Sequence, residues 1–563
     1  MHVNALVAVL LAAQAPPAQA PAAPAPAPAP AQPPERRDTA ALDAALRALA
    51  ERNPSATVSV PWTSAGGRPV HLLRLADPAG DPDARPGILV VAGMAGERWS
   101  TTEAALLAAD ALLAGHADLL RDVTFYVVPR ANPDSAERFL AGPRQSNSRN
   151  DLQRDDDRDG RIDEDGPRDL DGDGVVAQMR IERPKAPWPE ADRVPDPAEP
   201  RLMRAPDAAE GQRATHLVVT EGVDADGDGA VAEDPAGGID PDRNFPHRWP
   251  EFAPDAGAYP LCVPESRGLA DFVIAHPTLV AALVLGRHDT AVARPDGKGK
   301  TPGGMPEMLD PKDVDQYAGL AKAWCDATGQ KRAEGSDAAG SLVAWLNAQR
   351  GLPTVAATLW GRPDVEGEEE GAKKPDPPKP VPADAEAARW LRRSDTLGGT
   401  GFVAWHPFGH PQLGAVEIGG WVAGFRENPP PAEVAALGGR CADFLARAAA
   451  MRPAVTLRDA VATELAPGLL RVDATLANDG RLPTAMRGGR APGIAPAHVV
   501  RISVPVERVR SGRPVQVVRG LDAGQSMRLS WIVSVAADEP VELRLTHGPR
   551  PMQSVRLRGG NAP

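Results

Sequence analysis

The stretch Gly87-Ile88-Leu89-Val90-Val91 decides the fold of this chain. It contains no polar side chain, a helical pattern follows it at Thr102–Ala114, and a second apolar stretch lies at Val123–Val128. Strands that are apolar at every position are buried on both faces of a sheet, between layers of helices. The sequence therefore predicts an α/β fold with a mixed, mostly parallel sheet that is flanked by helices.

The same alternation of helices and apolar strands extends over residues 40–452. Helical patterns lie at Ala40–Arg52 and Pro431–Ala450, and another apolar strand lies at Ala281–Leu285. In sheets of this type, ligands bind beyond the carboxyl ends of the strands. We therefore expect the functional residues directly after these strands.

The pattern changes after Met451. Apolar residues alternate with polar ones over Leu470–Leu476, and similar short strands, separated by glycine and proline turns, recur as far as Leu557. A period of two residues is typical of strands with one buried face. Residues 453–563 are therefore predicted to form a small all-β sandwich.

The N-terminal segment has the pattern of an export signal. Its apolar run, Ala5–Ala13, is shorter than the roughly 20 residues that span a bilayer, and Ala-Gln-Ala triplets follow it. We expect an export signal at residues 1–15, a proline- and alanine-rich linker at residues 16–39, and a periplasmic or extracellular protein. The alternative is that this segment is a disordered alanine-rich tail.

The overall composition excludes some classes of partner. The net charge is -13, so the chain lacks the excess of Lys and Arg that a nucleic-acid surface requires. We expect neither a nucleic-acid partner nor a transmembrane segment. The 61 prolines and 54 glycines predict long irregular connections, including a solvated loop at Val365–Ala388. Three cysteines, Cys262, Cys325 and Cys441, allow at most one disulfide, and their pairing stays open.

Residues 150–236 form an acidic insert with an internal repeat. Carboxylates on alternate residues, then a glycine at position six and an apolar residue at position eight, are the pattern of a calcium loop. The candidate calcium ligands are Asp155, Asp157, Asp159, Glu164 and Asp165 in the first copy, and Asp224, Asp226, Asp228, Glu233 and Asp234 in the second; a partial copy lies at Asp169, Asp171 and Asp173. The usual acid at position twelve is absent, so the alternative is a set of solvated acidic loops.

Four segments carry a resemblance to a known family. They are Gly93-Met94-Ala95-Gly96-Glu97-Arg98-Trp99-Ser100, Asn132-Pro133-Asp134, Gly238-Ile239-Asp240-Pro241-Asp242-Arg243-Asn244-Phe245-Pro246, and Gly340-Ser341 with the residues up to Leu359. The first is similar to the Gly-x-His-x-x-Glu segment of the zinc carboxypeptidases of the carboxypeptidase A type, and the others resemble that family's later segments in the same order. The resemblance implies its fold and a cleft for the C-terminus of a peptide or of a peptidoglycan stem.

The resemblance also implies a set of site residues. In that family two histidines and a glutamate hold one zinc ion, and a second glutamate activates the bound water. Here Glu97 is assigned to the ligand glutamate and Met94 to the first histidine position. The second histidine position falls on Gly286, with His288 two residues further on as a rearranged ligand.

The remaining catalytic positions are also altered. Thr358 stands where the general base belongs, and Glu417 is the strand glutamate that could replace it. Arg243, with Asp242 beside it, matches the arginine that binds a terminal carboxylate. Arg149 matches the arginine that stabilises the oxyanion, with Arg144 as its rival.

Three functions follow from these residues. The first is a catalytically impaired member of the zinc carboxypeptidase family that keeps a peptide cleft and calcium-stabilised loops. The second is an active metallocarboxypeptidase with a rearranged zinc site of Glu97, His288 and Glu417. The third is a calcium-stabilised surface adhesion or scaffold protein in which the sandwich binds the partner.

Overall fold

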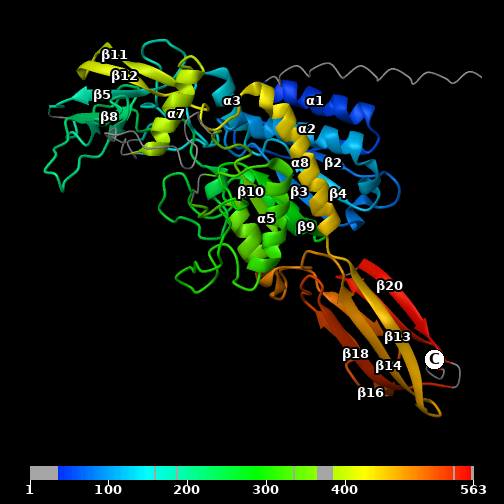
Figure 1. The fold of residues 1–563 in the computed structure, drawn as a ribbon. Coiled ribbons are helices and arrows are strands. Elements are labelled where there is room, and N and C mark those ends of the chain that lie inside the picture. Colours follow the sequence, from blue (N-terminus) through cyan, green and yellow to red (C-terminus); the bar gives the residue numbers. More distant parts are fainter. Residues whose placement is uncertain are drawn as a thin grey trace, which may run out of the picture.

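The computed structural model describes residues 36–156, 160–185, 188–333, 337–363, 384–536, 539–548 and 550–559. An α/β region carries a small four-stranded sheet on one side, and a sandwich of antiparallel strands follows at the C-terminal end (Figure 1). The predicted fold class is therefore confirmed. The predicted export signal, residues 1–15, lies outside the described residues, as do residues 16–35 of the predicted linker.

The central sheet has six strands in the order β1-β2-β4-β3-β9-β10. Strands β4, β3, β9 and β10 are parallel to one another, and β1 and β2 are added antiparallel at one edge. The bounds are Ala56–Thr63 for β1, Pro69–Leu75 for β2, Gly87–Val91 for β3, Thr124–Val128 for β4, Leu279–Leu285 for β9 and Thr354–Ala357 for β10. The first quoted stretch, β3, is thus an interior strand of this sheet.

Successive residues of β3 enter two separate cores. Ile88 and Val90 belong to one apolar cluster, and Leu89 and Val91 belong to the other. All five residues of the strand are buried. Because side chains alternate between the faces of a strand, an apolar run without polar breaks fills both cores at once.

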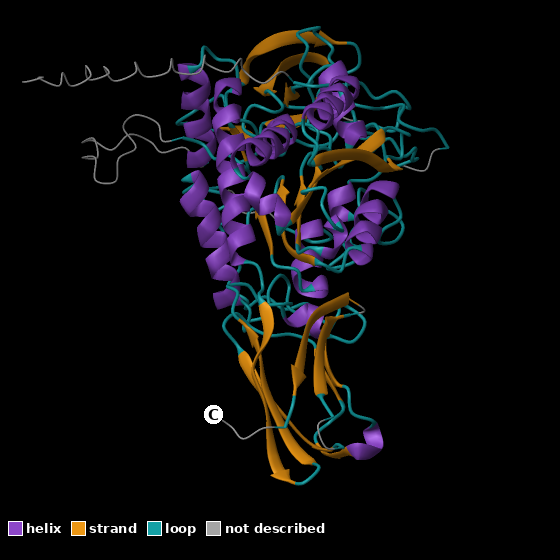
Figure 2. Cartoon of the chain, turned by 90° about the vertical axis from the view of Figure 1, so that its right-hand side faces the viewer, coloured by secondary structure: helices purple, strands orange, loops and turns teal. Residues whose placement is uncertain are grey.

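Helices cover both faces of this sheet (Figure 2). The first core contains residues of α1, α2, α5 and α8, and the second contains residues of α4 and α6. The helix bounds are Thr39–Arg52 for α1, Trp99–Gly115 for α2, Pro133–Ala141 for α3, Pro264–Ala275 for α4, Val314–Thr328 for α5, Leu342–Ala344 for α6, Ala385–Thr396 for α7 and Pro431–Met451 for α8. No described helix is long and apolar enough to cross a membrane.

The acidic insert contributes strands to a second sheet, of order β11-β12-β5-β8. Strands β5 (Gln178–Glu182) and β8 (His216–Thr220) come from the insert, and β11 (Phe402–His410) and β12 (Gly414–Trp421) come from after the central sheet; a short pair, β6 (Val194–Pro195) and β7 (Met203–Arg204), lies beside them. Met179 and Ile418 are fully buried in their shared core. An apolar core therefore orders part of the insert, which the sequence pattern did not indicate.

The C-terminal strands form two four-stranded antiparallel sheets, β13-β14-β18-β16 and β17-β15-β19-β20. Their bounds are Val455–Ala466 for β13, Leu469–Asn478 for β14, His498–Ile502 for β15, Val509–Ser511 for β16, Val515–Val518 for β17, Ser526–Ser534 for β18, Val541–His547 for β19 and Arg550–Leu557 for β20. Trp531 is fully buried between the two sheets. The predicted all-β sandwich is present at this end of the chain.

The sandwich is attached to the α/β region through backbone contacts. Met486 donates to the carbonyl of Gly351 at 2.8 Å. A Cβ on Gly351 would lie 2.2 Å from the nitrogen of Gly489, and the φ of Gly351 is +64°. Only glycine fits this position, because it lacks a side chain and tolerates a positive φ.

The prediction of a loop at Val365–Ala388 is wrong at its C-terminal end. Its last four residues, Ala385–Ala388, begin helix α7, and Asp384 caps that helix by accepting from the amide of Ala387 at 2.8 Å. Residues 364–383 lie outside the described residues. The acidic and proline-rich composition hid a helix start that the N-cap aspartate marks.

The sandwich contains a buried histidine pair that makes its stability depend on pH. His498 and His547 face each other across β15 and β19 with ring centroids 4.5 Å apart. Burial, and then the charge of His547, lower the pKa of His498 from 6.5 to about 3. The unfolded chain therefore binds more protons than the folded chain below pH 6.5, so stability is lost as the pH falls.

We predict that His498→Phe weakens this pH dependence. Between pH 7 and pH 5 the wild-type sandwich should lose on the order of 2 kcal/mol through His498, and the variant should be spared that loss. Hydrogen exchange of the β15 and β19 amides at the two pH values measures the effect. An equal loss in both proteins would contradict the assignment to His498.

Candidate functional site

A cavity of about 750 Å³ opens beyond the carboxyl ends of the parallel strands. Arg98 follows β3, Arg287 follows β9 and Thr358 follows β10, and all three line this cavity. Two tryptophans, Trp360 and Trp390, form part of its wall with ring centroids 5.5 Å apart. The cavity therefore lies at the edge of the sheet where the sequence predicts functional residues.

The described lining of this cavity is strongly basic. Six cationic side chains line it, against two carboxylates: Arg98, Arg287, Lys331, Arg332, Arg362 and Arg426, with Glu386 and Glu427. Arg362 pairs with Glu386 at 2.7 Å. In a chain with a net charge of -13, this local excess of positive charge favours an anionic ligand.

In the segment after β3, the side chains that face the core and the cavity differ from the predicted ones. Met94 is 1% exposed and belongs to the second apolar core, with Leu89 and Val91. Arg98 lines the cavity. Counted from Gly93, the pattern Gly-x-His-x-x-Glu places Ala95 at the histidine and Arg98 at the glutamate. The assignment of Met94 and Glu97 to these positions was therefore shifted by one residue.

Glu97 stays close to the cavity without lining it. Its carbonyl accepts from the Asn428 amide at 2.6 Å, and its Oε2 is buried without a hydrogen-bond partner in the described structure. Burial raises the pKa of Glu97, and the charges of Arg98 and Arg287 offset part of this shift. The charge of Glu427 acts in the opposite direction and raises this pKa.

Arg287 is the side chain that the sequence reasoning missed. It pairs with Asp240, and its Nε lies 3.9 Å from Oδ2 of Asp242. Burial alone would lower the pKa of Arg287, but Asp240 and Asp242 raise it above its ordinary value. The available signal was the position of an arginine two residues after a buried strand, opposite an Asp-x-Asp pair.

His288 contacts the carboxylate of Asp242, as Arg287 does. Its Nε2 is 3.3 Å from Oδ2 of Asp242, and both side chains are nearly fully buried. Burial alone would raise the pKa of Asp242, but His288, Arg287 and the amide of Leu342 together hold it below its ordinary value. The neighbouring Asp289 accepts from the amides of Ala291, Val292 and Ala293, and the carboxylate that pairs with His288 is that of Asp242.

Thr358, at the expected position of the base, and Glu417, the candidate replacement, both bond to other groups. Thr358 donates to the carbonyl of Trp360 at 3.2 Å and accepts from Gln330 at 3.2 Å. Glu417 lies in β12, in the second sheet, where Arg180 donates to it at 2.7 Å. The structure therefore places Glu417 in a different sheet from Thr358, because its strand pairs with the insert.

The candidate carboxylate-binding arginines do not line this cavity. Arg243 pairs with Asp255 at 2.9 Å, so it is not the partner of Asp242. Arg149 pairs with Asp156 and lies against the carbonyls of Pro235 and Gly237. Among the described lining residues, the cations are instead those that follow β3, β9, α5, β10 and β12.

Arg144, the rival of Arg149, lies in another place. Its amide donates to the carbonyl of Gly174 at 3.0 Å, and its side chain lines a separate cavity of about 320 Å³ with Trp99 and Phe139. The structure therefore brings none of the three arginines that the sequence singled out into the basic cavity.

Comparison with known families agrees with this geometry. Residues 42–170, which include β3, the Arg98 segment and β4, match the family model described as "Zinc carboxypeptidase". This match covers the first part of the α/β region and the beginning of the acidic insert. Residues 454–556 match a family described as "Domain of unknown function (DUF8731)".

Solved structures of carboxypeptidases are similar to the chain at low identity. Bovine thrombin-activatable fibrinolysis inhibitor is 14% identical over 57% of this chain and 85% of its own, with a TM-score of 0.33. Carboxypeptidase A from Helicoverpa armigera is 16% identical over 58% of this chain and 66% of its own, with a TM-score of 0.35. A metallo-carboxypeptidase from Burkholderia cenocepacia is 27% identical over 17% of this chain and 26% of its own, with a TM-score of 0.16. No curated protein matches the chain.

The residues at the positions of the family's zinc ligands do not fit the zinc ion that the family usually holds. Zinc takes histidine nitrogen, cysteine sulfur and carboxylate oxygen in tetrahedral geometry. Here the family positions carry Ala95, Arg98 and Gly286, and the groups of metal-type side chains in the described structure include neither Glu97 nor His288. Two guanidinium groups line the cavity in place of ligands, so no catalytic step through zinc follows from this geometry.

The acidic insert contains three loops with one shared geometry. In each, the first aspartate accepts from the amide of the glycine five residues later: Asp155 with Gly160 at 3.1 Å, Asp169 with Gly174 at 2.9 Å, and Asp224 with Gly229 at 3.1 Å. The three glycines have φ of +96°, +84° and +96°. The partial copy therefore folds like the two full ones. Asp157 and Asp159 lie outside the described residues.

The apolar anchors of the two full loops differ. Val231 packs against the core of the second sheet, whereas Ile162 is 45% exposed. Ile162, the apolar residue at position eight of the first repeat, therefore does not anchor its loop in a core. Asp234 is 3% exposed, and its amide donates to the carbonyl of Asp165 at 3.4 Å, so the two full repeats lie side by side.

We predict that Arg287→Met destabilises the protein by about 3–5 kcal/mol, because two buried carboxylates lose their guanidinium partner. Urea unfolding followed by circular dichroism measures the change. Lys322→Met is the matched control: Lys322 pairs with Asp326 on the surface and is 71% exposed. Its removal should cost less than about 1 kcal/mol. Equal losses in the two variants would show that Arg287 is not a buried charge partner.

Proposed function

We propose that this protein is a zinc carboxypeptidase-family member that has lost zinc hydrolysis and binds the C-terminal carboxylate of peptides in its basic cavity. The observation that carries the proposal is that the guanidinium groups of Arg98 and Arg287 line the cavity at the ends of β3 and β9. An arginine binds a carboxylate through parallel hydrogen bonds, but it neither lowers the pKa of a bound water nor acts as a Lewis acid. The site is therefore suited to recognition and not to hydrolysis.

The protein is further proposed to act outside the cytoplasm and to bind calcium in its acidic insert. Support for calcium comes from the three loops with the same turn and from the oxygens of Asp224, Asp226 and Asp228, which lie within 4.8 Å of one another. Oxygen ligands in irregular geometry are those that calcium accepts. Export is proposed from the sequence of residues 1–15 alone.

We predict that the purified chain takes up no stoichiometric zinc after incubation with zinc and desalting. The triple variant Ala95→His, Arg98→Glu and Gly286→His should bind it, because a Cβ at Gly286 meets no atom within 4 Å and leaves room for an imidazole. Elemental analysis by mass spectrometry measures the metal.

The matched control replaces Ala95→His by Met94→His in the same triple variant. Because Met94 points into the apolar core, this control should not bind zinc. Stoichiometric zinc in the wild-type chain, together with release of C-terminal residues from a peptide, would overturn the proposal in favour of an active metallocarboxypeptidase.

For the cavity we predict selective binding of a free carboxylate. An N-acetylated dipeptide with C-terminal phenylalanine should bind at least roughly tenfold more tightly than its C-terminal amide, because a charge-assisted hydrogen bond contributes about 1.5–3 kcal/mol. Trp360 and Trp390 lie in the wall, so tryptophan fluorescence reports the titration. Arg98→Gln should reduce the affinity for the acid roughly tenfold, whereas Lys322→Gln, on the surface of α5, should leave it unchanged. Equal affinity for acid and amide would exclude carboxylate recognition.

A further inference from the structure

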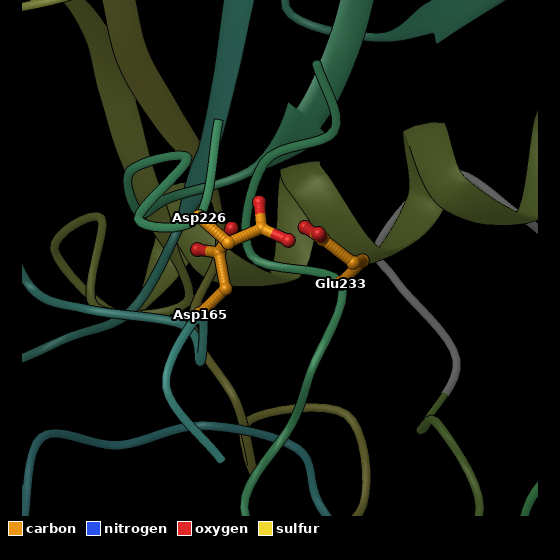
Figure 3. A group of neighbouring side chains, drawn as sticks. All are labelled: Asp165, Asp226 and Glu233. Atoms are coloured by element: carbon orange, nitrogen blue, oxygen red, sulfur yellow. The ribbon is translucent and has the colours of Figure 1, made fainter. Parts of the chain in front are cut away.

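A cluster of three carboxylates lies between the two full acidic repeats (Figure 3). Asp165 ends the first repeat, and Asp226 and Glu233 belong to the second. One oxygen from each lies within 4.8 Å of the others. The cluster therefore combines side chains that are about 60 positions apart in the sequence.

The backbone holds the two repeats together at this point. Oδ2 of Asp165 accepts from the amide of Ala225 at 3.1 Å, and the amide of Arg168 donates to the carbonyl of Glu221 at 2.9 Å. These hydrogen bonds hold Asp165 opposite the second repeat, and one of them orients its carboxylate.

Asp165 differs from the carboxylates of exposed acidic loops because it is buried. Its side chain is 1% exposed, and its Oδ1 has no hydrogen-bond partner in the described structure. Oε2 of Glu233 is buried in the same way. Figure 3 shows the three carboxylates pointing toward one another. A buried carboxylate oxygen without a partner costs free energy unless a cation satisfies it.

The electrostatic surroundings favour a cation at this position. Asp226 also belongs to a second group of carboxylates, with Asp224 and Asp228, whose oxygens lie within 4.8 Å of one another. Five carboxylates are thus gathered here, and an ion with two positive charges would relieve their repulsion.

The spacing of the oxygens fits calcium. Calcium binds oxygens at about 2.3–2.6 Å in irregular geometry, so its ligand atoms lie up to about 5 Å apart, whereas magnesium requires about 2.0–2.1 Å and a near-octahedral set. An oxygen spacing within 4.8 Å therefore allows one calcium ion to contact all three side chains.

We infer that Asp165, Asp226 and Glu233 hold one calcium ion that joins the two repeats. This inference rests on the proposed calcium binding of the insert and changes its arrangement: the ion lies between the loops, so each repeat is incomplete without the other. A bound ion of this kind links distant segments of the chain and stabilises only the folded insert.

The test counts calcium ions on the full chain after removal of metal by chelation. Equilibrium dialysis with calcium chloride and elemental analysis give the number bound to the wild type and to the variants Asp165→Asn, Glu233→Gln and the double variant. Each single variant should lose one ion or bind it at least tenfold more weakly, and the double variant should lose the same single ion. Asp173→Asn, in the third loop, is the matched control and should keep this ion.

The outcomes separate the inference from the proposed function. Loss of two ions in the double variant would show that the repeats bind calcium separately, which overturns the shared site but keeps calcium binding. A wild-type chain that binds no calcium would overturn both. Thermal melting in chelator controls for folding: since each variant removes a repelling charge, its melting temperature without calcium should equal or exceed that of the wild type, and only the upward shift with calcium should be lost.

Discussion

Burial of both faces of the central sheet is the constraint on which the rest of this structure depends. Ile88 and Val90 fill one core while Leu89 and Val91 fill the other, so the strand interiors have no room for polar groups. Polar side chains are accommodated where the strands end, because the backbone there turns away from both cores. The basic cavity, with Arg98, Arg287 and Thr358 at three neighbouring strand ends, is the direct result.

At these strand ends, arginine side chains supply positive charge. Arg287 is held by Asp240 and Asp242, and His288 contacts the same Asp242. Asp240 and Asp242 are buried, and the hydroxyl of Ser148 and the amide of Leu342 donate to them, so both carboxylates are fixed where Arg287 meets them. An ion-pair network thus lies at the end of β9, and it fixes the position of Arg287 at the edge of the cavity.

The acidic insert shows a second way in which charge and packing are combined. Its strands β5 and β8 pair with β12 and share an apolar core around Met179 and Ile418. This core brings the second repeat next to the first and buries Asp165 between them. An apolar contact therefore creates the position at which three carboxylates meet, and the same contact makes that position costly without a cation.

Several features could be predicted from the sequence because their causes are local. The apolar run at Gly87–Val91 specifies a strand buried on both faces, the alternation at Leu470–Leu476 specifies a strand with one buried face, and the Asp-x-Asp-x-Asp-Gly pattern specifies a turn in which the first aspartate bonds to the glycine amide. Each depends on side-chain periodicity or on hydrogen bonds within a few residues. The fold class followed from these patterns.

The composition of the site depended on tertiary structure. Met94 and Ala95 are neighbours in the sequence, so the register of this segment decides which of them faces the cleft. A shift by one residue reverses which side chains face the core. Several contacts join segments that are far apart in the sequence. Arg287 pairs with Asp240 and Asp242, the strand of Glu417 pairs with the insert, and Asp165 lies next to Glu233. Sequence alone determined what each segment could form; long-range packing and charge pairing decided which side chains meet.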